Sequence, residues 1–322
     1  MSRRGPDVDE LVAGAATGDP RAVARLISLV EDAAPLLRDV MRALAPLAGG
    51  ARVIGLTGSP GVGKSTTTNA LVTEYRRRGL RVGVLAVDPS SPFSGGALLG
   101  DRVRMQDHAT DRGVYIRSMA SRGHLGGLAW ATPQAVRVLD AAGCAVILVE
   151  TVGVGQAEVH VASLADTTVV LVAPGMGDGI QAAKAGILEI ADVFVVNKAD
   201  RDGGDQAARD LRHMLSMGDR SDPAGWRPPV IKSVATRGEG IAEVVGALDS
   251  HADWLAESGR LDARRRLRAA DEIEAIAATQ LRERMGDLRG GSVLDSLAGR
   301  VVAGESDPYS AADQLIAGMI SR

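Results

Sequence analysis

The chain has 322 residues, of which 45% are apolar and 2% aromatic, so we expect one large domain with appendages and an aliphatic core. Its formal net charge of −3 gives no electrostatic footprint for nucleic acid or an anionic membrane surface. No apolar run is long enough to span a bilayer, the first residues lack an apolar signal core, and the single cysteine, Cys144, cannot form an internal disulfide. These features favour a cytoplasmic protein without nucleic-acid or membrane partners.

Residues 1–50 are expected to form an N-terminal helical extension. Apolar residues recur there at helical spacing. Gly18-Asp19-Pro20 separates two helices, with Asp19 as a cap and Pro20 in the first turn of the second helix. Gly49-Gly50 then marks a hinge into the next domain.

Residues 51–257 alternate short β-rich runs with helical stretches. This alternation predicts a doubly wound, mostly parallel α/β sheet that is covered by helices on both faces. The expected strands are residues 53–57, 81–88, 114–117, 145–150, 167–173, 193–197 and 230–234. Ligands of such sheets bind beyond the carboxyl ends of the strands.

A phosphate-binding loop follows the first expected strand. Residues 58–65 read Gly-Ser-Pro-Gly-Val-Gly-Lys-Ser, which matches the pattern G-x-x-x-x-G-K-[ST] between a strand and a helix. Backbone N–H groups and the helix N-terminus favour phosphate there, Lys64 would neutralise the β- and γ-phosphates, and the Ser65 hydroxyl would bind Mg²⁺. We expect nucleotide contacts from Gly58, Ser59, Pro60, Gly61, Val62, Gly63, Lys64, Ser65 and Thr66.

Three acidic residues are candidates for the Mg²⁺ site together with Ser65. Asp88 and Glu150 each end an expected strand, and Asp101 lies in a Gly-rich segment. A buried carboxylate is costly without a cation, so Glu150 suits the role of a Walker-B acid. Gly153, three residues later, can offer its N–H to the γ-phosphate. Helix capping or turn formation is the alternative for Asp88 and Asp101, and a structural role is the alternative for Glu150.

The candidate catalytic residues for attack of water on the γ-phosphate are Lys64, Asp101, Glu150 and Gln156. Small G proteins with D-x-x-G-Q carry the glutamine directly after the glycine. Here that position is Val154, and Gln156 comes two residues later. We therefore expect slow intrinsic hydrolysis, or hydrolysis that waits for a group supplied from elsewhere.

A guanine-recognition motif follows the strand at 193–196. In Asn197-Lys198-Ala199-Asp200, the Asp200 carboxylate can accept from both N1–H and the exocyclic amine of guanine, donors that adenine lacks in that arrangement. Lys198 would cover the base plane, and Asn197 would tie its loop to the phosphate loop. The residues expected to support guanine from the other side are Ser233, Val234 and Ala235. An ordinary turn is the alternative for that last group.

Residues 258–322 are expected to form a C-terminal helical arm. Residues 261–288 read as one long, charged helix, and a final helical segment follows Asp307-Pro308. An apolar stripe along the long helix consists of Ile273, Ile276, Leu281 and Met285. Such a stripe packs on a second copy of the protein, which predicts a homodimer, or on its own domain as a brace.

Four segments together resemble the MeaB/MMAA/ArgK family of SIMIBI-class P-loop GTPases. They are the phosphate loop at 58–65, Asp-Pro-Ser-Ser-Pro-Phe-Ser-Gly-Gly at 88–96, Leu-Gly-Asp-Arg-Val-Arg-Met at 99–105, and Glu-Thr-Val-Gly-Val-Gly-Gln at 150–156. The resemblance implies a homodimeric, Mg²⁺-dependent GTPase that binds GTP and GDP. It also implies a chaperone of an adenosylcobalamin-dependent acyl-CoA mutase, chiefly methylmalonyl-CoA mutase. Such a chaperone gates cofactor loading from a cobalamin adenosyltransferase and protects or rescues the mutase.

The resemblance further implies a switch segment at residues 174–184, with Asp178, Gln181 and Lys184 as its candidate residues. Asp178 and Lys184 can exchange ion-pair partners between nucleotide states, which is one physical way to build a switch. A solvated loop with a helix-capping aspartate is the alternative.

Two other functions stay open from the sequence. One is a kinase that acts on a transport system for basic amino acids, although no element resembling H-R-D supplies a base. The other is a nickel-insertion GTPase, although five scattered histidines and one cysteine make no metal-transfer site. The identity of the acyl-CoA mutase is also open among methylmalonyl-CoA, isobutyryl-CoA and ethylmalonyl-CoA forms.

Overall fold

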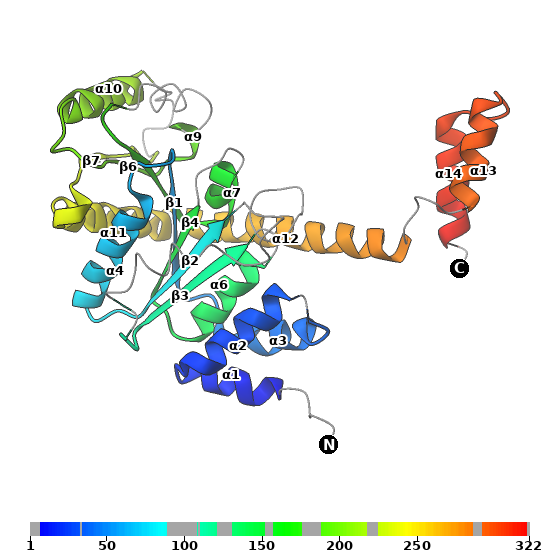
Figure 1. Cartoon of the computed structure of the whole chain (residues 1–322), viewed down its shortest axis with the longest axis horizontal. Coiled ribbons are helices and arrows are strands. Elements are labelled where there is room, and N and C mark those ends of the chain that lie inside the picture. Colours follow the sequence, from blue (N-terminus) through cyan, green and yellow to red (C-terminus); the bar gives the residue numbers. More distant parts are fainter. Residues whose placement is uncertain are drawn as a thin grey trace. The chain divides into compact units, whose positions relative to one another are not determined.

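The computed structural model describes residues 7–32, 34–88, 108, 110–120, 131–151, 157–175, 188–217, 225–285 and 292–320. By packing, the chain divides into two units, Met1–Asp262 and Ala263–Arg322 (Figure 1). Each unit is described by itself below. No helix in the described ranges is long and apolar enough to cross a membrane.

The described part of the first unit is built on a seven-stranded sheet whose strand pairs are all parallel. The strands are β1 (Arg52–Thr57), β2 (Val82–Asp88), β3 (Val114–Ala120), β4 (Val146–Thr151), β5 (Thr167–Val172), β6 (Val193–Val196) and β7 (Val230–Lys232). Their order in space is β3-β2-β4-β1-β5-β6-β7. The expected doubly wound α/β fold is confirmed, and every expected strand is present with small changes at its ends.

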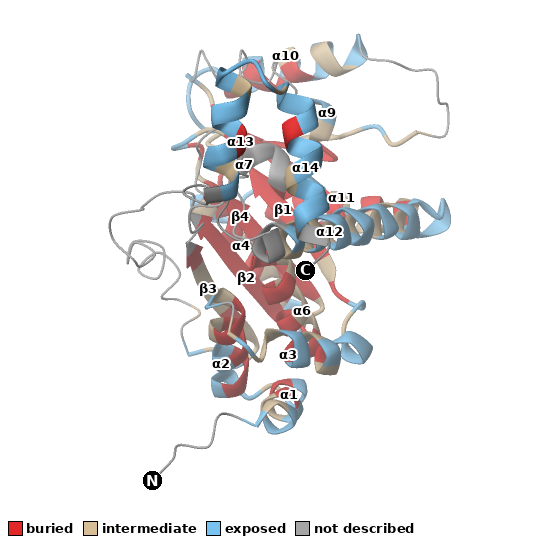
Figure 2. Cartoon of the chain, turned by 90° about the vertical axis from the view of Figure 1, so that its right-hand side faces the viewer, coloured by how far each residue is buried: buried red, intermediate tan, exposed pale blue. Residues whose placement is uncertain are grey.

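The central strands are buried because helices cover both faces of the sheet (Figure 2). All residues of β4, β5 and β6 are buried, as expected for parallel strands with near-continuous apolar runs. On one face, α4 (Lys64–Arg77) and α11 (Ile241–Glu257) pack over Ile54, Leu56, Val84 and their neighbours. The opposite face is covered by α6 (Thr132–Ala141), α7 (Ala157–Leu164) and α10 (Gly204–Ser216). A short helix, α9 (Leu188–Ile190), precedes β6.

Three N-terminal helices pack against α6 (Figure 1). They are α1 (Val8–Ala16), α2 (Pro20–Glu31) and α3 (Leu37–Leu44), and the 3₁₀ turn η1 (Ala45–Leu47) follows them. The Asp19 side chain accepts from the Arg21 N–H, and Pro20 is the first residue of α2, so the predicted cap is confirmed. Asp140 on α6 accepts from the Gly49 N–H at 2.5 Å and the Ala51 N–H at 3.0 Å. These bonds fix the expected hinge onto the sheet domain.

The second unit contains most of α12 (Arg260–Met285), together with α13 (Ser292–Val302) and α14 (Pro308–Ile320). Asp307 caps α14 by accepting from the N–H groups of Tyr309 and Ser310. On α12, Ile273 is 68% exposed and Leu281 is 59% exposed. These two members of the predicted stripe therefore lie open within the described residues, while the side chain of Met285 lies outside them.

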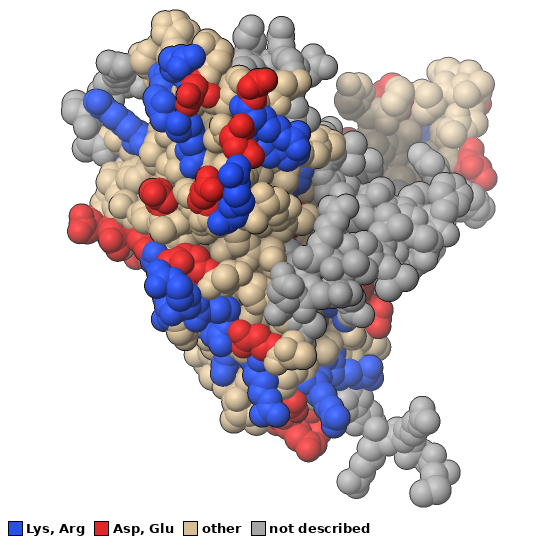
Figure 3. Space-filling model, turned by 60° about the vertical axis from the view of Figure 1, so that its left-hand side comes forward, with Lys and Arg blue, Asp and Glu red and all other residues tan. Residues whose placement is uncertain are grey.

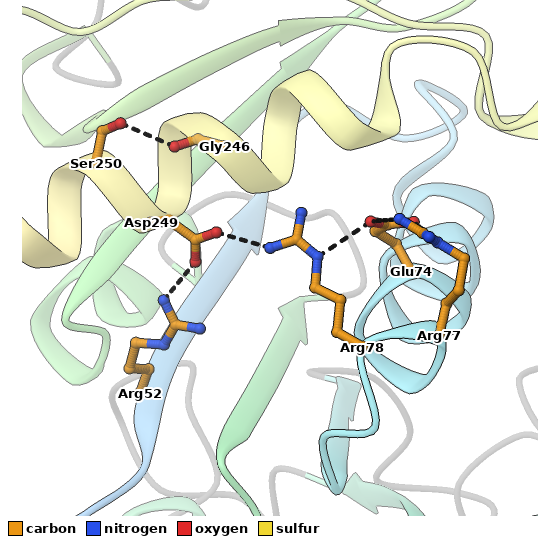
Figure 4. A network of polar contacts seen from close by, with 7 residues as sticks. All are labelled: Arg52, Glu74, Arg77, Arg78, Gly246, Asp249 and Ser250. Atoms are coloured by element: carbon orange, nitrogen blue, oxygen red, sulfur yellow. Dashed lines mark hydrogen bonds and ion pairs between the residues drawn. The ribbon is translucent and has the colours of Figure 1, made fainter.

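An ion-pair network joins the end of α4 to α11 and to the start of β1 (Figure 4). Asp249 on α11 accepts from Arg52 at 2.6 Å and from Arg78 at 2.8 Å. Glu74 in turn accepts from Arg77 at 2.8 Å and from Arg78 at 3.1 Å. On the face shown in Figure 3, basic and acidic side chains are interspersed rather than gathered into patches of one charge. Hydrogen bonding from Arg77 is the main cause that lowers the pKa of Glu74 from 4.5 to about 2.

Because the pKa of Glu74 is depressed by folding, its stabilising effect is present above pH 4.5 and is lost as the pH falls toward 2. The Glu74→Gln variant should therefore lose less stability than the wild type between about pH 5 and about pH 3. Urea unfolding across that range measures the effect, which will be modest because the Arg77 side chain is 71% exposed. Glu243→Gln, which changes an exposed carboxylate on α11, should keep the wild-type pH profile. Equal profiles for Glu74→Gln and the wild type would contradict the assignment.

Candidate nucleotide-binding site

The expected strand-loop-helix arrangement is present around residues 58–65. β1 ends at Thr57 and α4 begins at Lys64. Gly58 has φ 141°, and a Cβ there would lie 2.3 Å from the carbonyl oxygen of Leu171 on β5. Gly63 has φ 97°, and its Cβ would lie 2.4 Å from Asn197 Nδ2. At both positions a side chain would meet its neighbours at impossible distance, so the tight path of the loop requires glycine.

Lys64 is buried, and its ammonium group is held at the loop. Its Nζ donates to the carbonyl oxygens of Gly58 at 2.5 Å and Ser59 at 3.2 Å. The side chain is directed back over the loop, and the first turn of α4 follows directly. A positive charge and the N-terminus of a helix therefore meet at one place, which favours a phosphate group there.

Glu150 lies next to the start of α4, although it comes from β4. In the sheet it is paired with Leu56 of β1, and it is only 3% exposed. Its Oε1 accepts from Ser65 Oγ at 2.6 Å, and its Oε2 lies 2.9 Å from Thr68 Oγ1. Sequence reasoning named Ser65 and Glu150 but missed Thr68. The available signal was its position four residues after Lys64, on the same side of the helix.

Asn197 connects the loops that follow three different strands. Its Nδ2 donates to the Val62 carbonyl at 2.8 Å, and its Oδ1 accepts from the Ala235 N–H at 3.1 Å and from Ser233 Oγ at 3.4 Å. The side chain is buried. The expected tie between Asn197 and the phosphate loop is therefore present, and it extends to the loop after β7.

Lys198 and Asp200 lie at the edge of this arrangement. Lys198 has φ 56° and is the one non-glycine residue in the described ranges with a positive φ. Its Nζ donates to the Gly61 carbonyl at 2.6 Å, so it also spans to the phosphate loop. Asp200 pairs with Arg237 at 2.6 Å, and both side chains are about half exposed. Arg237 belongs to η4 (Ala235–Arg237) and was not anticipated from the sequence.

A cavity of about 480 Å³ opens between α4 and the segment that begins with η4. Thr66 and Ala235, both expected to contact nucleotide, line this cavity. Val234 comes directly before Ala235 in the chain. The other lining residues are Asn69, Ala70, Thr73, Glu74, Thr236, Gly238, Ile241 and Ala242. The cavity thus adjoins both the helix that follows the phosphate loop and the loop after β7.

The remaining expected site residues lie outside the described ranges. They are Asp101, Gly153, Gln156, Asp178, Gln181 and Lys184. Asp88 ends β2 as predicted, but its side chain also lies outside the described part of the structure. The described core of the site therefore consists of the phosphate loop, Ser65, Thr68, Glu150 and the Asn197 connection.

Removing the Asn197 amide should loosen the site. In Asn197→Ala the Val62 carbonyl and the Ala235 N–H lose their partner, which costs about 1–3 kcal/mol for each buried group left unsatisfied. We expect lower stability in urea unfolding and weaker GDP binding by fluorescence titration. Ser233→Ala removes only the 3.4 Å contact and should have a smaller effect. Equal effects of the two variants would contradict the bridging role of Asn197.

Known proteins are similar to this chain in both sequence and fold. Residues 23–288 match the family described as "Methylmalonyl Co-A mutase-associated GTPase MeaB". The chain is 49% identical over 310 residues to a protein of Pyrococcus abyssi that is named provisionally as a GTPase, with 96% of each chain covered. It is 39% identical over 251 residues to "GTPase ArgK" of Escherichia coli, with 76% of each chain covered.

Two further comparisons extend this result. The chain is 41% identical over 216 residues to "Methylmalonic aciduria type A homolog, mitochondrial" of Mus musculus, which covers 66% of this chain and 52% of that one. The crystal structure of "LAO/AO transport system kinase" superposes with a TM-score of 0.73 at 26% identity and covers 100% of both chains. The chain therefore belongs to the MeaB family of methylmalonyl-CoA mutase-associated GTPases, with the α/β P-loop fold of that family.

Proposed function

We propose that this GTPase requires Mg²⁺ and acts as a chaperone of an adenosylcobalamin-dependent acyl-CoA mutase, with methylmalonyl-CoA mutase as the first candidate client. The observation that supports the nucleotide part is the buried Asn197 side chain, which links the phosphate loop to the loops after β6 and β7. The client is supported by the family description and by the name of the mouse relative. In this function the chaperone gates cofactor loading from a cobalamin adenosyltransferase and protects or reactivates the mutase.

The oxygen atoms that meet at the start of α4 are suitable ligands for Mg²⁺. The Ser65 hydroxyl and the Glu150 carboxylate are oxygen donors 2.6 Å apart, and Mg²⁺ prefers oxygen ligands and keeps several waters. Ser65 and Glu150 would hold the cation, with Asp88 and Asp101 as further candidates. When bound, Mg²⁺ neutralises charge that develops on the phosphate oxygens.

The chain's own groups would supply the other part of catalysis. Lys64 brings an ammonium group to the loop, and the N-terminus of α4 adds its positive end. Both lie at the phosphate loop, where they would stabilise negative charge that develops on the γ-phosphate. Gln156 and Asp101 are the proposed residues for positioning water and metal, and Gly153 is the proposed donor to the γ-phosphate.

Guanine selection is assigned to Asp200. A carboxylate has about four acceptor sites, so the ion pair with Arg237 leaves positions for the N1–H and amine of guanine. Lys198, held to Gly61, lies at the same loop. Ser233, Val234 and Ala235 would support the base from the opposite side, where the Ala235 N–H is already fixed by Asn197.

The Asp200→Asn variant should lose most of its preference for guanine over adenine. An amide presents one acceptor and one donor where guanine needs two acceptors, which costs about 1–3 kcal/mol, or about 5-fold to 150-fold in affinity. Competition titration with GDP and ADP measures the ratio. Asp202→Asn alters an exposed carboxylate in the same loop and should keep the wild-type ratio. An unchanged GDP/ADP ratio in Asp200→Asn would show that the base is read elsewhere.

The client is tested by GTP hydrolysis with and without the organism's own cobalamin-dependent acyl-CoA mutase, with ATP as the control. We expect a slow, GTP-selective rate that rises several-fold with the mutase, because the chain carries Val154 where small G proteins place their glutamine. An equal rate of GTP hydrolysis with and without the mutase would contradict the proposal that the mutase is the client.

A kinase is the second candidate, because a structure that spans the whole chain carries the name of a transport-system kinase. Transfer of the γ-phosphate to a protein would leave labelled phosphoprotein, whereas hydrolysis leaves labelled inorganic phosphate. The hydrolysis assay with labelled GTP therefore separates the two reactions in a single experiment.

We also propose a cytoplasmic homodimer with an N-terminal extension at 1–50, a GTP-binding domain at 51–257 and a dimerisation arm at 258–322. Exposed apolar side chains on α12 to α14 support the arm as a contact surface; they are Leu267, Ile273, Leu281, Val293, Val302, Tyr309 and Ile316. The packing boundary after Asp262 falls close to the proposed start of the arm. Asp178, Gln181 and Lys184 are the proposed switch residues that would relay nucleotide state to the client.

A further inference from the structure

Both oxygens of the Glu150 carboxylate face hydroxyl groups of α4. Ser65 Oγ donates to Oε1 at 2.6 Å, and Thr68 Oγ1 lies 2.9 Å from Oε2. Ser65 and Thr68 are three residues apart, so they lie on the same side of the helix. Glu150 is 3% exposed and Thr68 is fully buried. Such a carboxylate is thus oriented through two points rather than one.

The Thr68 hydroxyl has one proton and two acceptors within reach. The carbonyl oxygen of Lys64 lies at 3.0 Å and Glu150 Oε2 at 2.9 Å. The carboxylate is the stronger acceptor, because a hydrogen bond to an ionised group is about twice as strong as one to a neutral group. The proximity of the Lys64 carbonyl corresponds to the side-chain rotamer in which a helical threonine hydroxyl faces the preceding turn. In that rotamer the hydroxyl also faces Glu150.

We propose that Thr68 is a positioning residue for the Mg²⁺ site, acting through Glu150. By holding Oε2, Thr68 fixes the carboxylate so that Oε1 accepts the Ser65 proton. Because the Ser65 proton is then directed at Glu150, the lone pairs of Ser65 Oγ are left for the cation. This inference rests on the proposed function, since it concerns the cation that accompanies the nucleotide.

The neighbouring Thr67 provides a matched control. It is also fully buried on α4, and its hydroxyl donates to the Gly63 carbonyl at 3.0 Å. Substitution by valine removes a helical side chain-to-carbonyl contact at either position and keeps the shape of the side chain. At position 68 alone, this substitution also removes a contact to Glu150. A purely structural role predicts similar behaviour for the two variants.

The experiment compares GDP affinity at saturating Mg²⁺ with GDP affinity in EDTA, using a fluorescent GDP analogue and the full chain. In the wild type Mg²⁺ should tighten GDP binding. In Thr68→Val this tightening should fall by about tenfold, the lower end for loss of a group that orients a metal ligand. The affinity in EDTA should stay unchanged. Thr67→Val should keep the wild-type ratio, and Thr68→Ser, which retains the hydroxyl, should restore it.

Thermal unfolding in EDTA without nucleotide checks that each variant is folded. If Thr68→Val is not folded, Thr68→Ala provides the same comparison without the hydroxyl. The inference is overturned if the Mg²⁺ effect in Thr68→Val equals that of the wild type, or if Thr67→Val loses as much. A wild type that binds GDP equally well with and without Mg²⁺ would overturn the metal site and this role of Thr68 with it. A wild type that does not bind GDP would overturn the proposed function itself.

Discussion

The described part of the candidate nucleotide site depends on one buried amide, the side chain of Asn197 directly after β6. Its donor reaches the Val62 carbonyl in the phosphate loop, and its acceptor receives the Ala235 N–H after β7. The three loops come from distant parts of the sequence, and each alone has many conformations. A buried amide whose hydrogen bonds are satisfied allows few other loop conformations, because breaking these hydrogen bonds leaves buried polar groups without partners. The loops that would contact phosphate and base are therefore held in a fixed relation.

The two ends of the sheet use buried carboxylates for different purposes. At the amino ends of β5 and β6, Asp166 and Asp192 accept backbone N–H groups of Val53 and Thr168. Those hydrogen bonds give partners to backbone N–H groups at the amino ends of the strands and hold this edge of the sheet rigidly. At the carboxyl end, Glu150 instead faces the hydroxyls of Ser65 and Thr68. Hydroxyl oxygens keep lone pairs that can bind a cation, so the described contacts at this edge leave atoms that could bind one.

Much of the fold could be predicted from local sequence patterns. The strands were predictable because parallel strands buried on both faces are nearly continuous apolar runs, as in residues 167–172. The helix start at Asp19 and Pro20 could be predicted from the sequence because capping involves only neighbouring residues. The phosphate loop was readable because its glycines, Lys64 and Ser65 occupy fixed positions in a continuous segment. The predicted link of Asn197 to the phosphate loop also agrees with the described contacts.

The sequence by itself thus determined the α/β sheet, the phosphate loop and the family. Only the tertiary structure decided which side chains form hydrogen bonds with the carboxylates of Glu150 and Asp200. Thr68 appears in the sequence as an ordinary helix residue, and Arg237 as part of a turn. They reach their carboxylates because β1 pairs with β4 in the sheet and the loop after β7 lies beside the loop after β6. Local patterns encode backbone conformation within a few residues, whereas these pairs are 82 and 37 residues apart and arise only when the strands come together.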